Sequence, residues 1–212
     1  LNMASLDGVT DVTARLMVDG LTVSNAVLGT VFTINDMAAD NAGDDFTINY
    51  ASVTGTTDTA QINTNQSVMQ QLVVPGIETV TLNNSGTKVT SIASLDLAAA
   101  TTINVDNSTA SVTAAGTTTP GLTITAEGGG NIATSMTFTG TGSTTTTGVL
   151  STALTTITGT AAGALDLNVS TNAGVLTVNL GASDDRLNVG AVGINLLATD
   201  SINLGGGTNT LA

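Results

Sequence analysis

Apolar and polar residues alternate along much of the chain. Residues 80–82, 103–105 and 122–124 place apolar side chains at every second position, with Thr or Asn between them. This period is typical of a β-strand that buries one face. The same alternation occurs in residues 136–138, 165–169, 175–180, 187–189 and 202–204. Because clusters of Gly, Asn, Asp and Ser separate these segments, the pattern predicts an all-β protein with short strands.

Two kinds of segment depart from the alternation. Residues 67–73 follow Asn65, a residue type that favours helix N-caps, and they predict a single helical turn. Between Val105 and Ile157 the strand spacing becomes irregular. In that stretch we expect longer loops at residues 117–120, 128–130 and 144–147, which are rich in Thr and Gly.

The spacing of the strands favours one architecture over another. Strand centres lie near Ile157, Leu167, Val178 and Leu187, and two such steps span about 20 residues, the length of one coil of a parallel β-solenoid. The same spacing fits an antiparallel β-sandwich. Short strands, small side chains and recurring outward Thr and Asn favour the solenoid, of the parallel β-helix or β-roll kind. The sandwich is the alternative.

The acidic residues divide the chain unevenly. Eight of the 16 acids lie in the first 60 residues: Asp7, Asp11, Asp19, Asp36, Asp40, Asp44, Asp45 and Asp58. We place an uncertain boundary within residues 61–75, between an acidic β-rich part (1–60) and a β-strand-repeat part (61–212). One continuous β-domain is the alternative. Since the chain begins at Leu1 and ends within a strand pattern, we expect it to be a piece of a longer protein.

The composition excludes most chemistries. The chain has no His and no Cys, and therefore neither an imidazole base nor a thiol nucleophile. Three Lys and Arg against 16 Asp and Glu leave no basic surface for nucleic acid. No apolar run approaches the roughly 18 residues of a membrane span. We therefore expect a protein that is not an enzyme, and the absence of Cys favours an extracellular location.

Asp-containing turns are the candidate metal ligands. Residues 181–187 and 205–211 keep a Gly-x-(Ser/Gly)-x-(Asp/Asn)-x-Leu skeleton close to the calcium-binding β-roll repeat, in which Asp ligates the ion. Ca²⁺ takes six to eight oxygen ligands, and a net charge of -13 gives the chain a reason to bind cations. The candidate Ca²⁺ ligands are Asp44, Asp45, Asp184, Asp185, Asp200 and Asn209.

Several short motifs resemble a known family. Residues 76–82 (Gly-Ile-Glu-Thr-Val-Thr-Leu), with residues 57–62, 94–97 and 102–105, are similar to the β-strand-repeat region of RTX-type bacterial surface-layer proteins and large secreted adhesins. Full Gly-Gly-x-Gly-x-Asp repeats are absent, and Asn209 stands where the repeat has Asp.

The resemblance implies a secreted structural protein at the bacterial cell surface, with Ca²⁺ sites. Its expected partners are copies of itself, in a layer or filament, and cell-surface polysaccharide reached through Ca²⁺. The alternatives are an adhesin stalk or passenger segment that binds glycans, and an accessory β-domain of a secreted enzyme.

Overall fold

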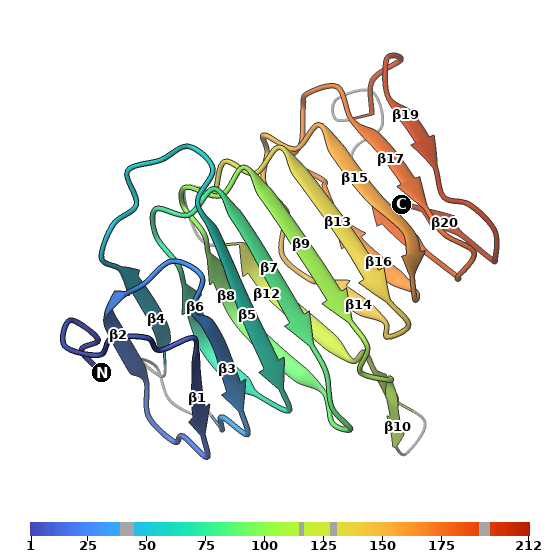
Figure 1. Ribbon diagram of the computed structural model, residues 1–212. Coiled ribbons are helices and arrows are strands. Elements are labelled where there is room, and N and C mark those ends of the chain that lie inside the picture. The colour runs from blue at the N-terminus through green and yellow to red at the C-terminus, as the bar shows by residue number, and fades with distance from the viewer. Residues whose placement is uncertain (39–44, 115–116, 128–130, 191–195) are drawn as a thin grey trace.

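The fold is a parallel β-solenoid. The computed structural model describes residues 1–38, 45–114, 117–127, 131–190 and 196–212. Two nine-stranded parallel sheets face each other along the whole stack, and the described residues contain no helix (Figure 1). The predicted solenoid is therefore confirmed, and the antiparallel sandwich is wrong because the strands of both sheets run parallel.

The chain alternates between the two sheets as it winds. In spatial order, sheet 1 contains β1 (Asp11–Arg15), β3 (Val31–Asn35), β5 (Thr59–Asn65), β7 (Thr79–Asn84), β9 (Thr102–Asn107), β13 (Ser135–Gly140), β15 (Thr156–Ala162), β17 (Thr177–Leu180) and β19 (Ser201–Asn203). Sheet 2 contains β2 (Leu21–Ala26), β4 (Asp45–Tyr50), β6 (Val68–Val73), β8 (Thr90–Asp96), β12 (Leu122–Glu127), β14 (Thr144–Thr146), β16 (Leu165–Asn168), β18 (Arg186–Asn188) and β20 (Thr210–Leu211). Each coil thus contributes one strand to each sheet.

Strand pairing sets the length of a coil. Thr156 pairs with Thr177 and Asp166 with Arg186, so a regular coil takes about 20 residues. One longer coil contains an antiparallel hairpin between β9 and β12, formed by β10 (Val112–Ala114) and β11 (Thr117–Thr119). This hairpin projects from one edge of the stack (Figure 1).

The core is a thin layer between the sheets. The alternation points every second side chain inward, where residues of successive coils stack in columns. One such column of sheet 1 pairs Phe32, Ile62, Leu82, Val105 and Phe138, all buried. Burying each of these side chains contributes about 1.5–3 kcal/mol. Aliphatic side chains make up most of this core, and Phe32, Phe46 and Phe138 are fully buried in it.

Two local predictions are corrected. Residues 67–73 form no helical turn, because Val68–Val73 is strand β6. Its buried Met69 and Leu72 are three positions apart instead of two, and Ile92 and Leu95 of the neighbouring β8 have the same spacing. Because both strands break the alternation at the same place, the buried positions of β6 resemble those of a helix.

Two of the predicted loops are strands. Residues 144–146 form β14 with Thr144 and Thr146 buried, and residues 117–119 form β11 of the hairpin. Thr-rich segments serve as strands here because Thr has a high β propensity. In β14 the buried hydroxyls also find partners inside the stack, since Thr144 Oγ1 accepts from Asn107 Nδ2 and Thr146 Oγ1 from the Asn168 N–H. The expected loop at residues 128–130 lies outside the described residues.

Both sheets continue through residues 61–75, where the composition changes. β3 pairs with β5 over five residues, and β4 pairs with β6. In the described part of the chain, no helix has the length and hydropathy needed to cross a membrane.

Candidate functional site

Three of the predicted calcium ligands lie together on two stacked turns. Asp184 and Asp185 precede β18, and Asn209 precedes β20 of the next coil. The backbone N–H of Asp185 donates to Asn209 Oδ1 at 2.9 Å, and that of Thr208 donates to Asp184 Oδ1 at 2.6 Å. The two turns are therefore joined by backbone-to-side-chain hydrogen bonds.

Among the acids that the structure describes, Asp185 is the one that is buried. The residue is 3% exposed, and its Oδ1 accepts the backbone N–H of Leu165 at 2.9 Å. Its Oδ2 is buried and finds no hydrogen-bond partner among the described residues. Burial raises the pKa of Asp185, the Leu165 N–H opposes this shift, and the charge of Asp184 adds to it.

The other predicted ligands lie elsewhere. Asp200 is at the opposite corner of the stack, where its two oxygens accept the backbone N–H groups of Leu176 at 2.9 Å and Leu197 at 2.7 Å. Asp45 begins β4, where it pairs with Gln71 of the neighbouring strand β6. It therefore lies many coils away from Asp184 and Asp185. Asp44 lies outside the described residues. The five described candidates therefore do not form one site.

The stacked turns supply the oxygen ligands that Ca²⁺ prefers, but too few of them to fill its coordination shell. Within the described residues, no group of three or more acids is placed to hold a metal ion. The stacked turns do offer hard oxygen donors, and Asp185 Oδ2 lacks a partner. An ion there needs turn carbonyls and water as its further ligands.

A column of buried polar side chains was not predicted. Thr64, Asn84, Asn107 and Thr144 are each at most 2% exposed and follow one another through four coils. Thr64 Oγ1 donates to Asn84 Oδ1 at 3.0 Å, and Asn84 Nδ2 donates to Asn107 Oδ1 at 2.9 Å. Asn107 Nδ2 donates to Ser143 O and to Thr144 Oγ1. We call this chain of bonds the amide column.

The sequence holds a signal for the amide column. Asn84 continues the apolar phase of Val80 and Leu82, and Asn107 that of Ile103 and Val105. A polar residue in the buried phase of a strand, repeated one coil later, is the pattern that identifies such a column.

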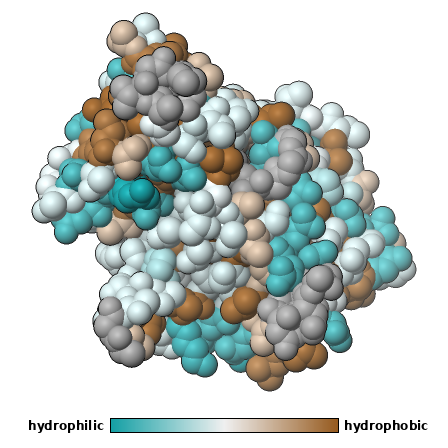
Figure 2. All heavy atoms as spheres, turned by 180° about the vertical axis from the view of Figure 1, so that it is seen from behind, coloured by the Kyte–Doolittle hydropathy of each residue, from teal (hydrophilic) through white to brown (hydrophobic). Residues whose placement is uncertain are grey.

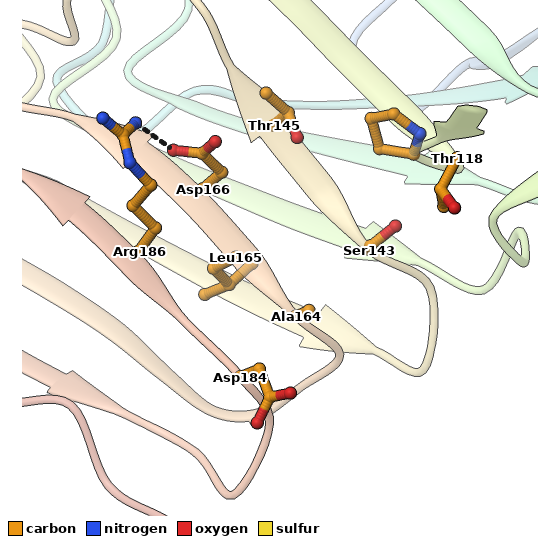
Figure 3. Close-up of a pocket in the computed structure, with 9 residues that line it drawn as sticks. Thr118, Ser143, Thr145, Ala164, Leu165, Asp166, Asp184 and Arg186 are labelled. Atoms are coloured by element: carbon orange, nitrogen blue, oxygen red, sulfur yellow. Dashed lines mark hydrogen bonds and ion pairs between the residues drawn. The ribbon is translucent and has the colours of Figure 1, made fainter. Parts of the chain in front are cut away.

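A shallow groove of about 280 Å³ lies beside the hairpin, on the outer side of sheet 2 (Figure 3). Its polar lining comes from Thr118 of the hairpin, Ser143 and Thr145, and from Asp166, Asp184 and Arg186. Arg186 Nη1 donates to Asp166 Oδ1 at 3.0 Å, and both side chains are nearly half exposed. This ion pair was not predicted from the sequence, although its two residues are one coil apart.

The groove combines hydroxyl groups, two carboxylates and one paired arginine with the apolar side chains of Pro120, Ala164 and Leu165. Its carboxylates are engaged away from Ser143, since Asp166 is paired with Arg186 and Asp184 Oδ1 accepts the Thr208 N–H, so neither activates a hydroxyl of the groove as a nucleophile. Comparisons with family models, with curated proteins and with solved structures find no match to this chain.

Proposed function

We propose that this chain is an extracellular structural protein that assembles with copies of itself into a layer or filament on the bacterial cell surface. The observation that supports this is the pair of continuous nine-stranded parallel ladders. A long stack with two hydrogen-bonded sheets and a thin packed core is stiff, and stacked-coil proteins present extended surfaces rather than deep sites. Such a body serves as a building block.

The same geometry favours a protein that is not an enzyme. The groove at the hairpin holds two acids: Asp166 is paired with Arg186, and Asp184 Oδ1 accepts the backbone N–H of Thr208. Glycoside hydrolysis needs two carboxyl groups facing each other across a sugar, and acyl transfer needs an activated nucleophile. Neither arrangement is supported by the residues of the groove.

Calcium belongs to the proposal as a stabilising ion. Support comes from the unpaired Asp185 Oδ2 and from the net charge of -13, because the negative groups of a compact body repel one another. Ca²⁺ bound at the stacked turns by Asp184, Asp185 and Asn209 would neutralise part of that charge. A second role is to bridge the acidic surface to anionic cell-surface polysaccharide.

Calorimetry tests the calcium role. We expect a higher melting temperature in millimolar Ca²⁺ than in excess EDTA, with Mg²⁺ giving a smaller rise because it resists dehydration. The matched variant is Asp185→Asn, which keeps the shape of the side chain and removes the charge. Equal melting temperatures of the wild type in Ca²⁺ and in EDTA would show that calcium does not stabilise the fold.

Electron microscopy tests the assembly role. Purified protein is imaged with Ca²⁺ and with EDTA over a range of concentrations. Ordered sheets or fibres support the structural function. Rods that stay dispersed under every condition contradict it.

Dispersed rods would favour a second candidate, a stalk or passenger segment of a secreted adhesin. The hydroxyl-lined groove beside the hairpin is the observation behind it, because hydroxyl groups and a paired Arg and Asp can contact a glycan. A glycan array separates this candidate from the first. The third candidate, an accessory domain of a secreted enzyme, requires hydrolase activity that maps to flanking sequence.

A further inference from the structure

We propose that two copies of this chain pack against each other through the outer face of sheet 1. This inference rests on the proposed self-assembly and assigns the surface that carries it. The surface consists of the outward residues in two adjacent columns of seven strands, which we call the Thr/Asn face. Its members are Thr59, Gln61, Thr79, Thr81, Thr102, Asn104, Ser135, Thr137, Thr156, Thr158, Thr177, Asn179, Ser201 and Asn203.

The Thr/Asn face carries no charge, although the protein is strongly acidic. Each of its side chains ends in a hydroxyl or an amide, and each is at least partly exposed. Three acids directly precede strands of the face, Asp58, Glu78 and Asp200, and each accepts a backbone N–H, that of Gly55 in the case of Asp58. Glu78 accepts the N–H of Asp58 at 2.9 Å, and Asp200 accepts two backbone N–H groups. Asp106 lies in a third column, where it accepts a hydrogen bond from Thr139.

The outer face of sheet 2 differs in each of these respects. It carries Asp45, Asp96 and Asp166, and it is interrupted by the groove at the hairpin. Seen from behind, on the sheet 2 side, the surface is a mosaic of hydrophilic and hydrophobic patches (Figure 2). Because like charges brought together cost several kcal/mol, two acidic copies approach most closely through the surface that has none.

The backbone makes the Thr/Asn face regular. Its strands are paired in register from β5 to β19, and the single shift lies beyond Thr137, outside the two columns. Side chains also bond along the stack, as where Asn203 Nδ2 donates to Asn179 Oδ1 at 2.9 Å. Two such faces can interdigitate with their sheets about 10 Å apart, as paired sheets with small uncharged side chains do.

The size of the face sets the strength of the contact. Seven strands spaced about 4.8 Å apart, with about 15 Å of each strand in contact, give roughly 500 Å² per copy. A standard stable interface buries about 800 Å² per partner. A single pair of copies therefore binds weakly, and the contact gains strength when many copies are arrayed in a layer.

Charge insertion with a matched control tests the inference. The test variant carries Thr81→Asp and Thr158→Asp on the Thr/Asn face. The control carries Thr47→Asp and Thr123→Asp, which are outward positions of sheet 2 with the same change in net charge. Sedimentation velocity over a concentration series follows association, and circular dichroism checks that each variant is folded.

We expect the wild type and the control to show a sedimentation coefficient that rises with concentration, and the test variant to lose this rise. Equal association of the test variant and the wild type would overturn the inference and leave self-assembly intact. Loss of association only in the control would also overturn it. A wild type that stays monomeric under every condition would contradict the proposed function as well.

Cysteine cross-linking gives a second measurement that does not depend on destabilising the face. The chain has no Cys, so Thr137→Cys introduces a single thiol at the middle strand of the face, and Thr123→Cys introduces one on sheet 2. Under mild oxidation we expect Thr137→Cys to form disulfide-linked dimers faster. Equal rates of dimer formation by the two variants would contradict the inference. So would a wild type that stays monomeric and binds insoluble cell-wall polysaccharide through the Thr/Asn face.

Discussion

Two columns of polar groups join neighbouring coils in different ways. One is the amide column, and the other, which we call the acidic column, links Leu165, Asp185 and Asn209 near the C-terminal end. In the amide column, Asn84 and Asn107 each donate through Nδ2 and accept through Oδ1. In the acidic column, Leu165, Asp185 and Asn209 are linked only by backbone N–H groups that donate to side-chain oxygens. An amide can therefore continue a ladder in both directions, whereas a carboxylate can only accept.

This difference has an energetic consequence. The hydrogen bonds of Asn107 use both ends of its amide, and the group carries no charge to desolvate. Asp185 has one oxygen bonded and one buried without a partner, and it carries a charge whose removal from water is costly. We expect the amide column to stabilise the fold at every pH and the acidic column to depend on pH.

Truncation of the amide column gives the largest expected effect. Asn107→Ala removes the acceptor of Asn84 Nδ2 and of the Thr109 N–H, and it removes the donor that Asn107 Nδ2 supplies to Ser143 O and to the buried Thr144 Oγ1. We expect a loss of about 3–4 kcal/mol in the free energy of unfolding, measured by urea denaturation. The control is Asn203→Ala, an exposed amide whose loss costs less than about 0.5 kcal/mol. Similar losses for the two variants would refute the special role of the column.

A glycine beside the amide column gives the next effect. Gly140 has φ +86°, and a Cβ there would clash with the backbone carbonyl of Asn107. We expect Gly140→Ala to cost about 2–3 kcal/mol in the same assay, through backbone strain and displacement of Asn107. Gly174→Ala is the control, because its Cβ would lie 3.7 Å from Asn172 Oδ1, an ordinary contact. An unchanged stability of Gly140→Ala would mean that the backbone near Asn107 adapts easily.

The acidic column gives a smaller effect that depends on pH. Because the pKa of Asp185 is raised in the folded protein, the folded state binds its proton more readily than the unfolded chain does. Its contribution to the free energy of unfolding is therefore most favourable below the usual Asp pKa of about 3.9 and falls as the pH rises through the raised value. Asp185→Asn lacks this ionisation.

The measurement is urea denaturation of the wild type and Asp185→Asn from pH 3 to pH 8, in EDTA so that calcium takes no part. We expect the variant to gain stability relative to the wild type as the pH rises, by about 1 kcal/mol at neutral pH. Since both proteins share every other acid, the difference between them isolates Asp185. A difference that does not vary with pH would show that Asp185 titrates as it does in the unfolded chain.

The exposed ion pair at the groove gives the smallest effect. Arg186 and Asp166 join neighbouring coils at 3.0 Å, but each side chain is more than 40% exposed. We expect Arg186→Gln to cost at most about 0.5 kcal/mol, and less at high salt. A loss comparable with that of Asn107→Ala would show that surface pairs, and not the buried column, join the coils.

Much of the fold was predictable because the solenoid repeats a local pattern. The ten-residue spacing near Ile157, Leu167, Val178 and Leu187 corresponds to β15, β16, β17 and β18. The prediction failed at residues 67–73, where an irregularity shared by β6 and β8 shifted the buried positions. A defect that two neighbouring strands share is invisible in either strand alone.

The candidate site was less predictable. The sequence placed Asp184, Asp185 and Asn209 in related turns, and they lie on adjacent coils. Asp45 and Asp200 are far from them, because similar turn sequences recur at different corners and coils of the stack. Four of the carboxylate oxygens that were read as metal ligands accept backbone N–H groups: Asp184 Oδ1, Asp185 Oδ1 and both oxygens of Asp200. Asp185 Oδ2 is buried without a partner among the described residues.

The sequence by itself determined the strands, their short length and the coil repeat, since alternation and spacing are local properties that each coil restates. It also determined the net charge of -13, and the lack of His and Cys excluded imidazole and thiol chemistry. The alternation also places Asn84 in the buried phase of its strand and Asn83 in the outward phase, but only the tertiary structure decided that Asn84 bonds to Asn107, one coil away. Hydrogen bonds between residues about 20 positions apart depend on how the coils are stacked, and stacking is a property of the assembled sheets.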